Sequence, residues 1–423
     1  MTWLLFVLFA VLCLLRVPIA FSLAISSLVI LVFQDFNLVT VVERMFSGIN
    51  SSSLMAIPGF ILTGVIMLKG GISKYLLDCL KAWIGHVSGG MAIVTILTCM
   101  VFGSISGSSI ATAVAVGSIM IPGMVNAGYD KKYAIGLVAT AGTLGSLIPP
   151  SISLIIYGTV TNTSIGDLFI ASLIPGIFFG LLLIVTAIIY ARRKGFGRLN
   201  PASWKERKQK TLKAIWGLIL PIIIFYCIYG GVATPTETSV IAVVYALIIS
   251  VFVYKEIKWK DIHGIFKETV QTSSMIYMLV AAASIFAMFL TMNQVPQNVA
   301  SWIAESSLNA WSLILVINIV LLIMGAFLDA ISIILITVPV IMPILQTMGI
   351  NLYHFAIVMA INLEIGMITP PVGLNLFVVS GITKEPLEKV IKAIIPFILI
   401  MLLGLLVVVV IPELSLGLIP NRK

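Results

Sequence analysis

Apolar segments long enough to cross a lipid bilayer follow one another along the whole chain. A bilayer-spanning helix needs about 20 mainly apolar residues, and these segments leave no stretch of the 423 residues for a sizeable soluble domain. Composition agrees, because 60% of the residues are hydrophobic and only 10% are charged, whereas soluble domains have about 25% charged residues. The sequence therefore predicts an all-α polytopic membrane protein and excludes a soluble globular fold.

The formal net charge of +9 is concentrated in one connector. Residues 192–213 (RRKGFGRLNPASWKERKQKTLK) contain nine basic residues and a single acid, Glu206. Nucleic-acid binding would require such a basic patch on a folded domain, whereas this segment joins two long apolar blocks. The positive-inside rule places it on the cytoplasmic face of the membrane. We therefore predict that residues 192–213 form a cytoplasmic loop.

A second basic stretch supports this orientation. Two further apolar runs, 214–231 and 237–254, lead to residues 254–268 (YKEIKWKDIHGIFKE), which contain more bases than acids. Two crossings return the chain to the cytoplasmic side, as the positive-inside rule requires. The apolar positions of this stretch suit a helix lying along the membrane surface, and residues 72–84 have the same character. We expect both segments to be surface-lying arms.

An internal repeat relates the two sides of the basic connector. A single offset of 221 residues superimposes six glycines and prolines, namely Pro122 on Pro343, Gly128 on Gly349, Gly145 on Gly366, Pro149 and Pro150 on Pro370 and Pro371, and Pro175 on Pro396. Glycine and proline dictate backbone shape, and a transporter built from two related halves leaves this trace in the sequence. We divide the chain into a first repeat (1–191), the basic loop (192–213) and a second repeat (214–423).

Each half contains breaks within its apolar runs. Residues 102–123 and 324–343 are interpreted as re-entrant hairpins, and residues 141–158 and 362–381 as broken helices, each interrupted by a Pro-Pro pair. Non-helical backbone at membrane depth cannot face lipid, because its free N–H and C=O groups would be unsatisfied there. Breaks in both halves therefore predict one shared central cavity.

The first hairpin carries a cluster of small polar residues. Residues 103–109 contain two glycines and four serines, and their hydroxyl and carbonyl oxygens are ligands that an alkali cation prefers. The alternative is close helix packing through small residues, which is the simpler explanation for Ser109 taken alone. Four serines together at a predicted break favour a binding loop.

The second half replaces the serines by larger polar groups. They are Asp329, Asn362, Glu364, Thr369 and Asn375. An ionisable residue at membrane depth is a functional candidate by default. The alternative for Asp329 and Glu364 is a carboxylate that caps a helix or binds a neighbouring backbone amide. Glu237, among the threonines of ATPTETS, is interpreted as a structural residue at a helix start.

Several long motifs are similar to one known family. They are RVPIAF (16–21), GSISGSSIATAVAVGSIMIP (103–122), GYDKKYAIGLVATAGTLGSLIPPS (128–151), ATPTE (233–237), GAFLDA (325–330) and TPPVGLNLFV (369–378). On these motifs the chain resembles the large membrane subunit of tripartite ATP-independent periplasmic (TRAP) transporters. The resemblance covers essentially the whole chain.

The resemblance implies a sodium-coupled importer of organic anions in the bacterial inner membrane. The family fold has two inverted repeats and works as an elevator, in which the hairpins and broken helices slide against a scaffold. The implied partners are a soluble periplasmic substrate-binding protein and a small four-helix membrane subunit. Because the sequence begins directly with the large-subunit motif, we expect the small subunit to be a separate chain.

The resemblance also implies the positions of at least two Na⁺ ions and of the substrate. The first ion is expected near Ser104, Ser106, Gly107, Ser108, Gly142, Thr143 and Gly145, and the second near Gly325, Phe327, Asp329, Gly366, Thr369 and Gly373. The substrate is expected near Ser108, Ser109, Pro149, Pro150, Pro370, Pro371 and Asn375, where helix N-termini favour a carboxylate.

Three other functions would require different features in the sequence or different partners. A stand-alone sodium-coupled carboxylate carrier of related elevator fold would need no binding protein, and a passive channel would need a continuous pore rather than an occluded site. An enzyme is disfavoured because the sequence contains no H-E-x-x-H zinc motif and no recognisable catalytic carboxylate pair, and no phosphate-binding G-x-x-x-x-G-K-[ST] motif indicates ATP use. The anion remains open among sialic acid, C4-dicarboxylates, keto-acids and sugar acids.

Overall fold

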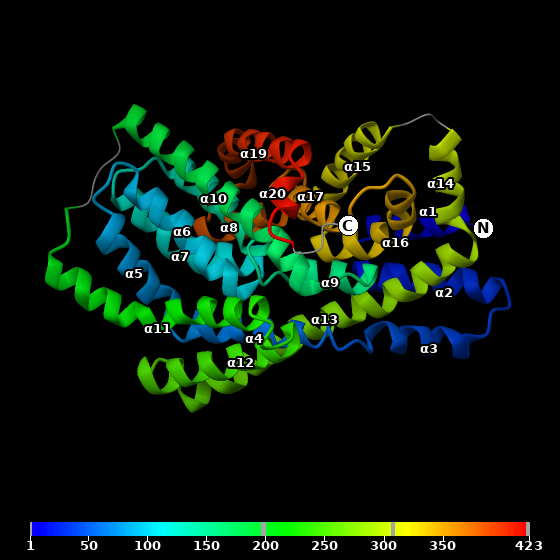
Figure 1. Cartoon of the computed structure of the whole chain (residues 1–423), viewed down its shortest axis with the longest axis horizontal. Coiled ribbons are helices and arrows are strands. Elements are labelled where there is room, and N and C mark those ends of the chain that lie inside the picture. Colours follow the sequence, from blue (N-terminus) through cyan, green and yellow to red (C-terminus); the bar gives the residue numbers. More distant parts are fainter. Residues whose placement is uncertain (1, 196–199, 306–308, 420–423) are drawn as a thin grey trace.

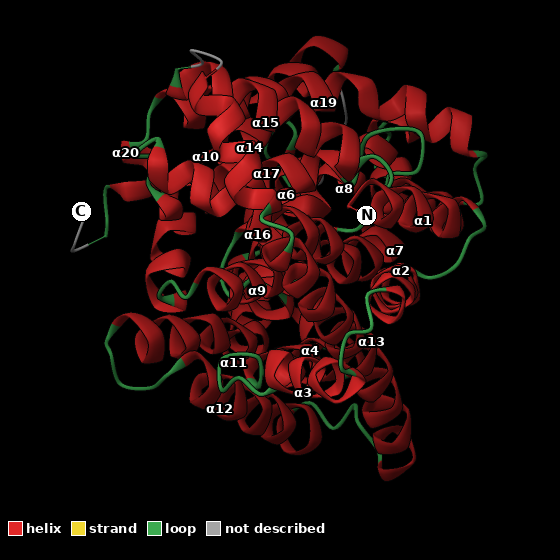
Figure 2. Cartoon of the chain, turned by 90° about the vertical axis from the view of Figure 1, so that its right-hand side faces the viewer, coloured by secondary structure: helices red, strands yellow, loops and turns green. Residues whose placement is uncertain are grey.

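The computed structural model describes residues 2–195, 200–305 and 309–419, and within these ranges the chain forms helices and no strand, as Figure 2 shows. The helices are α1 (Thr2–Leu14), α2 (Ile19–Phe33), α3 (Leu38–Ile49), α4 (Ala56–Lys69), α5 (Ile72–Ile84), α6 (Gly90–Ser106), α7 (Ser109–Asn126), α8 (Lys131–Leu147), α9 (Ile152–Thr161), α10 (Ile165–Lys194), α11 (Trp204–Tyr229), α12 (Pro235–Ile248) with the π-helical turn η1 (Ile249–Val253), α13 (Trp259–Met292), α14 (Val295–Glu305), α15 (Ala310–Gly325), α16 (Ala330–Thr347), α17 (Leu352–Gly366), α18 (Leu374–Thr383), α19 (Leu387–Val410) and α20 (Glu413–Leu416).

Eight helical segments of the described chain are long and apolar enough to cross a membrane, or nine if α4 and α5 form one bent span. Several further apolar helices, such as α6 and α17, are shorter than a full crossing. The prediction of an all-α polytopic membrane protein is confirmed.

Helix ends follow the local sequence. Thr234 caps α12 by accepting from the Glu237 amide, and the Glu237 carboxylate accepts from the Thr234 amide at 2.8 Å. This reciprocal capping box satisfies two amides that the helix leaves free. The structural interpretation of Glu237 is confirmed.

Both predicted hairpins are present, and each extends beyond its predicted range of 102–123 or 324–343. In the first, α6 and α7 meet at residues 107–108; in the second, α15 and α16 meet at residues 326–329. The predicted broken helices are α8 with α9 and α17 with α18, interrupted at residues 148–151 and 367–373. Each hairpin packs on the broken helix of its own half, and the halves also pack together, α7 on α18 and α9 on α16.

The basic segment 192–213 is mostly helical, so its prediction as a loop is wrong for the part that the structure describes. Residues 192–194 end α10, and α11 begins at Trp204, where the Ser203 hydroxyl accepts from the Glu206 amide. Residues 196–199 lie outside the described residues. The capping sequence SWKE explains the difference, because it starts a helix inside the charged stretch.

The predicted arms differ from one another. Residues 72–84 form α5, which bends by 63° from α4 and packs along α11. The second predicted arm is not a separate helix, because α13 begins at Trp259 and runs on without a break to Met292. A short amphipathic helix that the sequence analysis did not predict, α3, packs on α13 instead.

Helices α4 and α12 approach each other through glycine and serine. A Cβ atom added at Gly59 would lie 2.2 Å from the Ser239 Oγ, and one added at Gly70 would lie 2.1 Å from the Ser250 Oγ. Small residues at such crossings let helix backbones come close in a membrane. These contacts hold α4 and its C-cap Gly70 against α12 and η1.

We predict that Gly59→Ala destabilises the protein by about 1–3 kcal/mol, because the added methyl group overlaps Ser239 in a packed crossing. The measurement is the unfolding midpoint of the purified protein in detergent. Gly381→Ala is the matched control, because a Cβ atom at this helical glycine meets open space. Adding Ser239→Gly to Gly59→Ala should recover part of the loss; equal midpoints for Gly59→Ala and Gly381→Ala would contradict the packing argument.

Candidate functional site

The first hairpin tip lies on the first helix break. Gly107 ends α6 in the left-handed region at φ +61°, and its carbonyl accepts from the Ile152 amide at the start of α9 at 3.5 Å. A Cβ atom at Gly107 would lie 2.8 Å from the Pro150 carbonyl oxygen. This position therefore needs glycine for its conformation and for its close approach to the break.

Two glycines bring the hairpin into backbone contact with α8. A Cβ atom at Gly103 would lie 2.3 Å from the Gly145 Cα, and one at Gly145 would lie 2.3 Å from the Thr112 Oγ1. The Thr112 hydroxyl donates to the Ser108 carbonyl at 2.8 Å and lies 3.2 Å from the Ser106 hydroxyl. The hydroxyl and carbonyl oxygens of the tip are thus gathered against α8.

The second tip repeats this arrangement with different side chains. Gly325 and Gly366 are in backbone contact, since a Cβ atom at Gly366 would lie 2.5 Å from the Gly325 Cα. The carbonyl of Ala326 accepts from the amides of Val372 and Gly373 at 3.0 and 3.3 Å. Each half of the molecule therefore places a hairpin tip on a helix break and joins them by backbone hydrogen bonds.

Asp329 is the N-cap of α16. Its carboxylate accepts from the Ser332 amide at 3.1 Å and also from the Ser332 hydroxyl. The capping alternative for Asp329 is therefore confirmed. Such a cap leaves carboxylate lone pairs free for a cation, so this observation does not exclude an ion-binding role.

Glu364 joins the two halves. It is buried at 2% exposure in α17, and its carboxyl faces Ser109 and Ser146 of the first half. The Ser146 hydroxyl in turn accepts from the Ser109 amide at 3.0 Å. Glu364 is neither a helix cap nor bound to a neighbouring amide, as the alternative interpretation expected; it connects the second broken helix to the first hairpin and the first broken helix.

Several buried polar atoms near the second break have no hydrogen-bond partner in the described chain. They are the Oε2 of Glu364, the Oδ1 of Asn362, and both side-chain polar atoms of Asn375. Asn362 and Asn375 are fully buried, and a buried polar group without a partner is costly. Such groups mark a place where a ligand or water supplies the missing partners.

A cavity of about 430 Å³ lies beside these elements. It is lined by residues of α3, α9, α13 and α16, including Ser47, Asn162, Ser284 and Thr291. Arg44 is the one charged residue among the described residues that line it. Because α9 follows the first break and α16 follows the second hairpin tip, the cavity adjoins both halves of the candidate site.

The family profile described as "Tripartite ATP-independent periplasmic transporter, DctM component" matches residues 6–414. The chain belongs to this family. A C4-dicarboxylate TRAP transporter large permease protein of Pseudomonas aeruginosa is 44% identical over 401 residues, which cover 95% of this chain and 94% of that protein. An isethionate TRAP transporter permease protein of Oleidesulfovibrio alaskensis is 38% identical, over 96% of this chain and 65% of that protein.

Solved structures agree with this assignment at the level of the fold. The crystal structure of the YdaH transporter of Alcanivorax borkumensis superimposes with a TM-score of 0.63 at 15% identity, over 90% of this chain and 88% of that one. The TRAP permease is thus a multi-pass inner-membrane transporter subunit and not an enzyme.

The structure of the TRAP permease brings the residues predicted for each ion into one neighbourhood. The first set lies where the α6–α7 tip meets α8, and it consists of Ser104, Ser106, Gly107, Ser108, Gly142, Thr143 and Gly145. The second set lies where the α15–α16 tip meets the α17–α18 break, and it consists of Gly325, Phe327, Asp329, Gly366, Thr369 and Gly373. The two differ in exposure: the first set is buried apart from the half-buried Ser108, whereas Phe327 is 58% exposed. Their ion-binding roles stay predictions.

The residues predicted for the substrate divide between two surroundings. Ser109, Pro149, Pro150 and Asn375 are buried, Ser108 and Pro370 are half-buried, and Pro371 is exposed. Pro149–Pro150 and Pro370–Pro371 both have cis peptide bonds. Because Pro371 is exposed whereas its counterpart Pro150 is buried, the second break is the more accessible of the two.

Three polar residues of the site were not singled out from the sequence. Ser146 accepts from the Ser109 amide beside Glu364, Thr112 donates to the Ser108 carbonyl at the first tip, and Arg44 lines the cavity. A signal existed for Ser146, because it follows Gly145 and lies three residues before Pro149 of the Pro-Pro break. Nothing in the sequence relates Arg44 to the breaks, since it belongs to the unpredicted α3.

We predict that Glu364→Ala destabilises the protein by about 2 kcal/mol or more, because it leaves a void where the two halves pack together. Glu364→Gln should stay close to wild type, since the amide has nearly the same size and shape as the carboxyl group. The measurement is thermal unfolding in detergent, with Glu388→Ala, the loss of an exposed carboxylate, as control. An Ala variant as stable as wild type would show that Glu364 does not join the halves.

Proposed function

We propose that this permease is the transport subunit of a sodium-coupled secondary importer of a small organic anion. The observation that supports it best is the pair of hairpin tips seated on helix breaks, each with carbonyl, hydroxyl or carboxylate oxygens around the contact. Hard oxygen ligands at irregular backbone are the sites at which such transporters hold Na⁺. Ser104 and Ser106 at the first tip and Asp329 at the second are the proposed ion-binding side chains.

The anion is proposed to bind between the two tips. Helices α7, α9, α16 and α18 all begin at a tip or a break, and the positive end of a helix dipole favours a carboxylate there. Arg44 adds the positive charge of the adjoining cavity. The relatives named for C4-dicarboxylate and isethionate transport both handle small organic acids, so we propose a small dicarboxylate as the first substrate to test.

The proposed coupling between Na⁺ binding and anion binding follows from their opposite charges. A cation bound at either tip lowers the cost of burying the anion between them, and by reciprocity the anion tightens the binding of Na⁺. The two halves pack together through α7 on α18 and α9 on α16, so ordering at one break influences the other. We propose that this body, α6–α9 with α15–α18, moves as an elevator against the remaining helices.

The proposed partners are a periplasmic substrate-binding protein and a small membrane subunit. The family description, tripartite and periplasmic, supports both. The isethionate permease supports the small subunit, because this chain covers only 65% of that DctMQ protein. We propose that here the small subunit is a separate chain.

The test of the proposed function is uptake of radiolabelled succinate into proteoliposomes under an inward Na⁺ gradient. The purified permease is reconstituted with and without the small subunit and the substrate-loaded binding protein of the same system. Uptake is expected only when all three are present and Na⁺ is outside. Uptake by the permease alone would make it a stand-alone carrier, and uptake indifferent to Na⁺ would overturn sodium coupling.

A substitution at Asp329 separates ion binding from helix capping. Asn is as good an N-cap as Asp, so we predict that Asp329→Asn keeps the thermal stability but raises the Na⁺ concentration for half-maximal uptake at least about tenfold, through loss of a charge beside the cation. Ser104→Ala with Ser106→Ala should raise it as well. An unchanged Na⁺ titration in Asp329→Asn would leave this residue as a cap only.

A further inference from the structure

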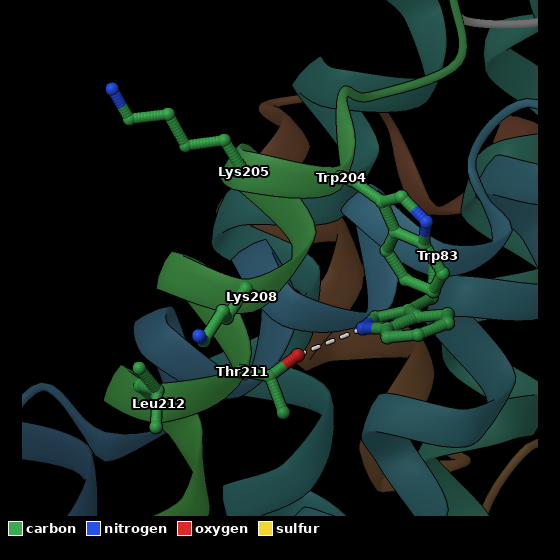
Figure 3. A pocket seen from close by; sticks show the side chains of 6 residues that line it. All are labelled: Trp83, Trp204, Lys205, Lys208, Thr211 and Leu212. Carbon is green, nitrogen blue, oxygen red and sulfur yellow. Dashed lines mark hydrogen bonds between the residues drawn. The ribbon is translucent and has the colours of Figure 1, made fainter.

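An open pocket of about 580 Å³ lies far from the hairpin tips, where the end of α5 meets the start of α11. Figure 1 places this meeting point at the left-hand end of the molecule. Six residues line the pocket, as Figure 3 shows: Trp83 from α5, and Trp204, Lys205, Lys208, Thr211 and Leu212 from α11. None of them belongs to the transport site described above.

Two tryptophans of the pocket lining are in contact with each other and with a neighbouring arginine. The rings of Trp83 and Trp204 meet edge to face with centroids 5.5 Å apart. The Arg207 guanidinium lies 5.5 Å from the Trp83 ring and 5.8 Å from the Trp204 ring, within the range of a cation–π contact. The Trp83 indole also donates to the Thr211 hydroxyl at 2.8 Å, which fixes its ring (Figure 3).

The pocket carries positive charge that the described chain does not neutralise. Residues 204–213 contain five bases and one acid, a balance of +4, and the acid, Glu206, pairs with Lys210 at 2.6 Å. Among the described residues, Lys205 and Lys208 form no ion pair. The Nε of Arg207 is buried and has no hydrogen-bond partner there. The pocket therefore offers cationic groups to a ligand from outside the chain.

The position of the pocket in the membrane decides the ligand class. The apolar part of α11 begins at Ala214, directly after the basic turns, and tryptophans favour the level of the lipid headgroups. Leu212 and Trp83 are 57% and 40% exposed, so an apolar surface continues from the lysines toward the hydrocarbon. The excess of bases puts this level on the cytoplasmic leaflet, which contains the anionic lipids.

We propose that the pocket binds one anionic phospholipid of the inner leaflet. Lys205 and Lys208 take the phosphate and the headgroup, and an acyl chain lies on Trp83 and Leu212. A free phosphate would use the lysines but not the apolar surface, whereas a phospholipid uses both. The bound lipid would fix the α5 arm to α11 at the membrane surface.

The test uses the purified chain in phosphatidylcholine nanodiscs with rising fractions of phosphatidylglycerol that carries bromine on its acyl chains. Bromine quenches tryptophan fluorescence on contact. Wild type is expected to show a saturable quench at a low fraction of this lipid, and only a weaker, non-saturating quench at the same fraction of brominated phosphatidylcholine, from exposed tryptophans such as Trp3 and Trp311 outside the pocket. Lys205→Gln with Lys208→Gln should shift the midpoint upward by roughly five-fold for each lysine removed.

Two further variants make the result specific. Lys258→Gln with Lys260→Gln is the matched control, because it removes two lysines beside the exposed Trp259, outside the pocket; its midpoint should equal that of wild type. Lys205→Arg with Lys208→Arg keeps the charge and should also retain the midpoint. Equal quenching by both lipids, an unchanged midpoint in the double Gln variant, or release of the lipid by inorganic phosphate would overturn the proposal.

Discussion

The need to satisfy backbone hydrogen bonds within a membrane governs this structure. A helix that breaks at membrane depth frees amides and carbonyls that lipid cannot pair. Here the breaks are paired by hairpin tips: the Gly107 carbonyl meets the Ile152 amide, and the Ala326 carbonyl meets two amides of residues 372–373. Backbones can approach this closely only because glycine faces glycine at 103 and 145 and again at 325 and 366. The oxygen-rich surroundings of both tips follow from the same contacts.

The two halves place different side chains around their hairpin tips. The first tip is buried and held by hydroxyl groups, whereas the second is more exposed and has a carboxylate, Asp329, as its helix cap. Glu364 of the second broken helix lies buried beside Ser109 and Ser146 of the first half. A symmetric backbone therefore carries an asymmetric set of side chains, which suits the proposed binding of a small anion in one defined orientation.

The positions of the breaks could be predicted from the sequence, because Pro149, Pro150 and their counterparts at 370 and 371 cannot continue a helix. Pairing across the halves could not, since Ser146 and Glu364 are distant in the chain and only the fold brings them together. The dense charge of the basic segment predicts a loop, whereas the short capping sequence at Ser203 starts a helix there. Helix α3, and Arg44 with it, could not be related to the site from the sequence, because α3 lies outside the repeated segments that carry the breaks.

The crossing of α4 and α12 has a consequence for how the length of this chain can vary. Gly59 and Gly70 are eleven residues apart, as are Ser239 and Ser250, so the two contacts have the same spacing along α4 and its C-cap as along α12 and η1. Inserting or deleting one residue between the contacts would rotate everything beyond it by about 100°, and in α12 it would bring Ile249 or Val251 to the place of Ser250. Insertions and deletions should therefore be tolerated in the connections between these helices, but not within either helix.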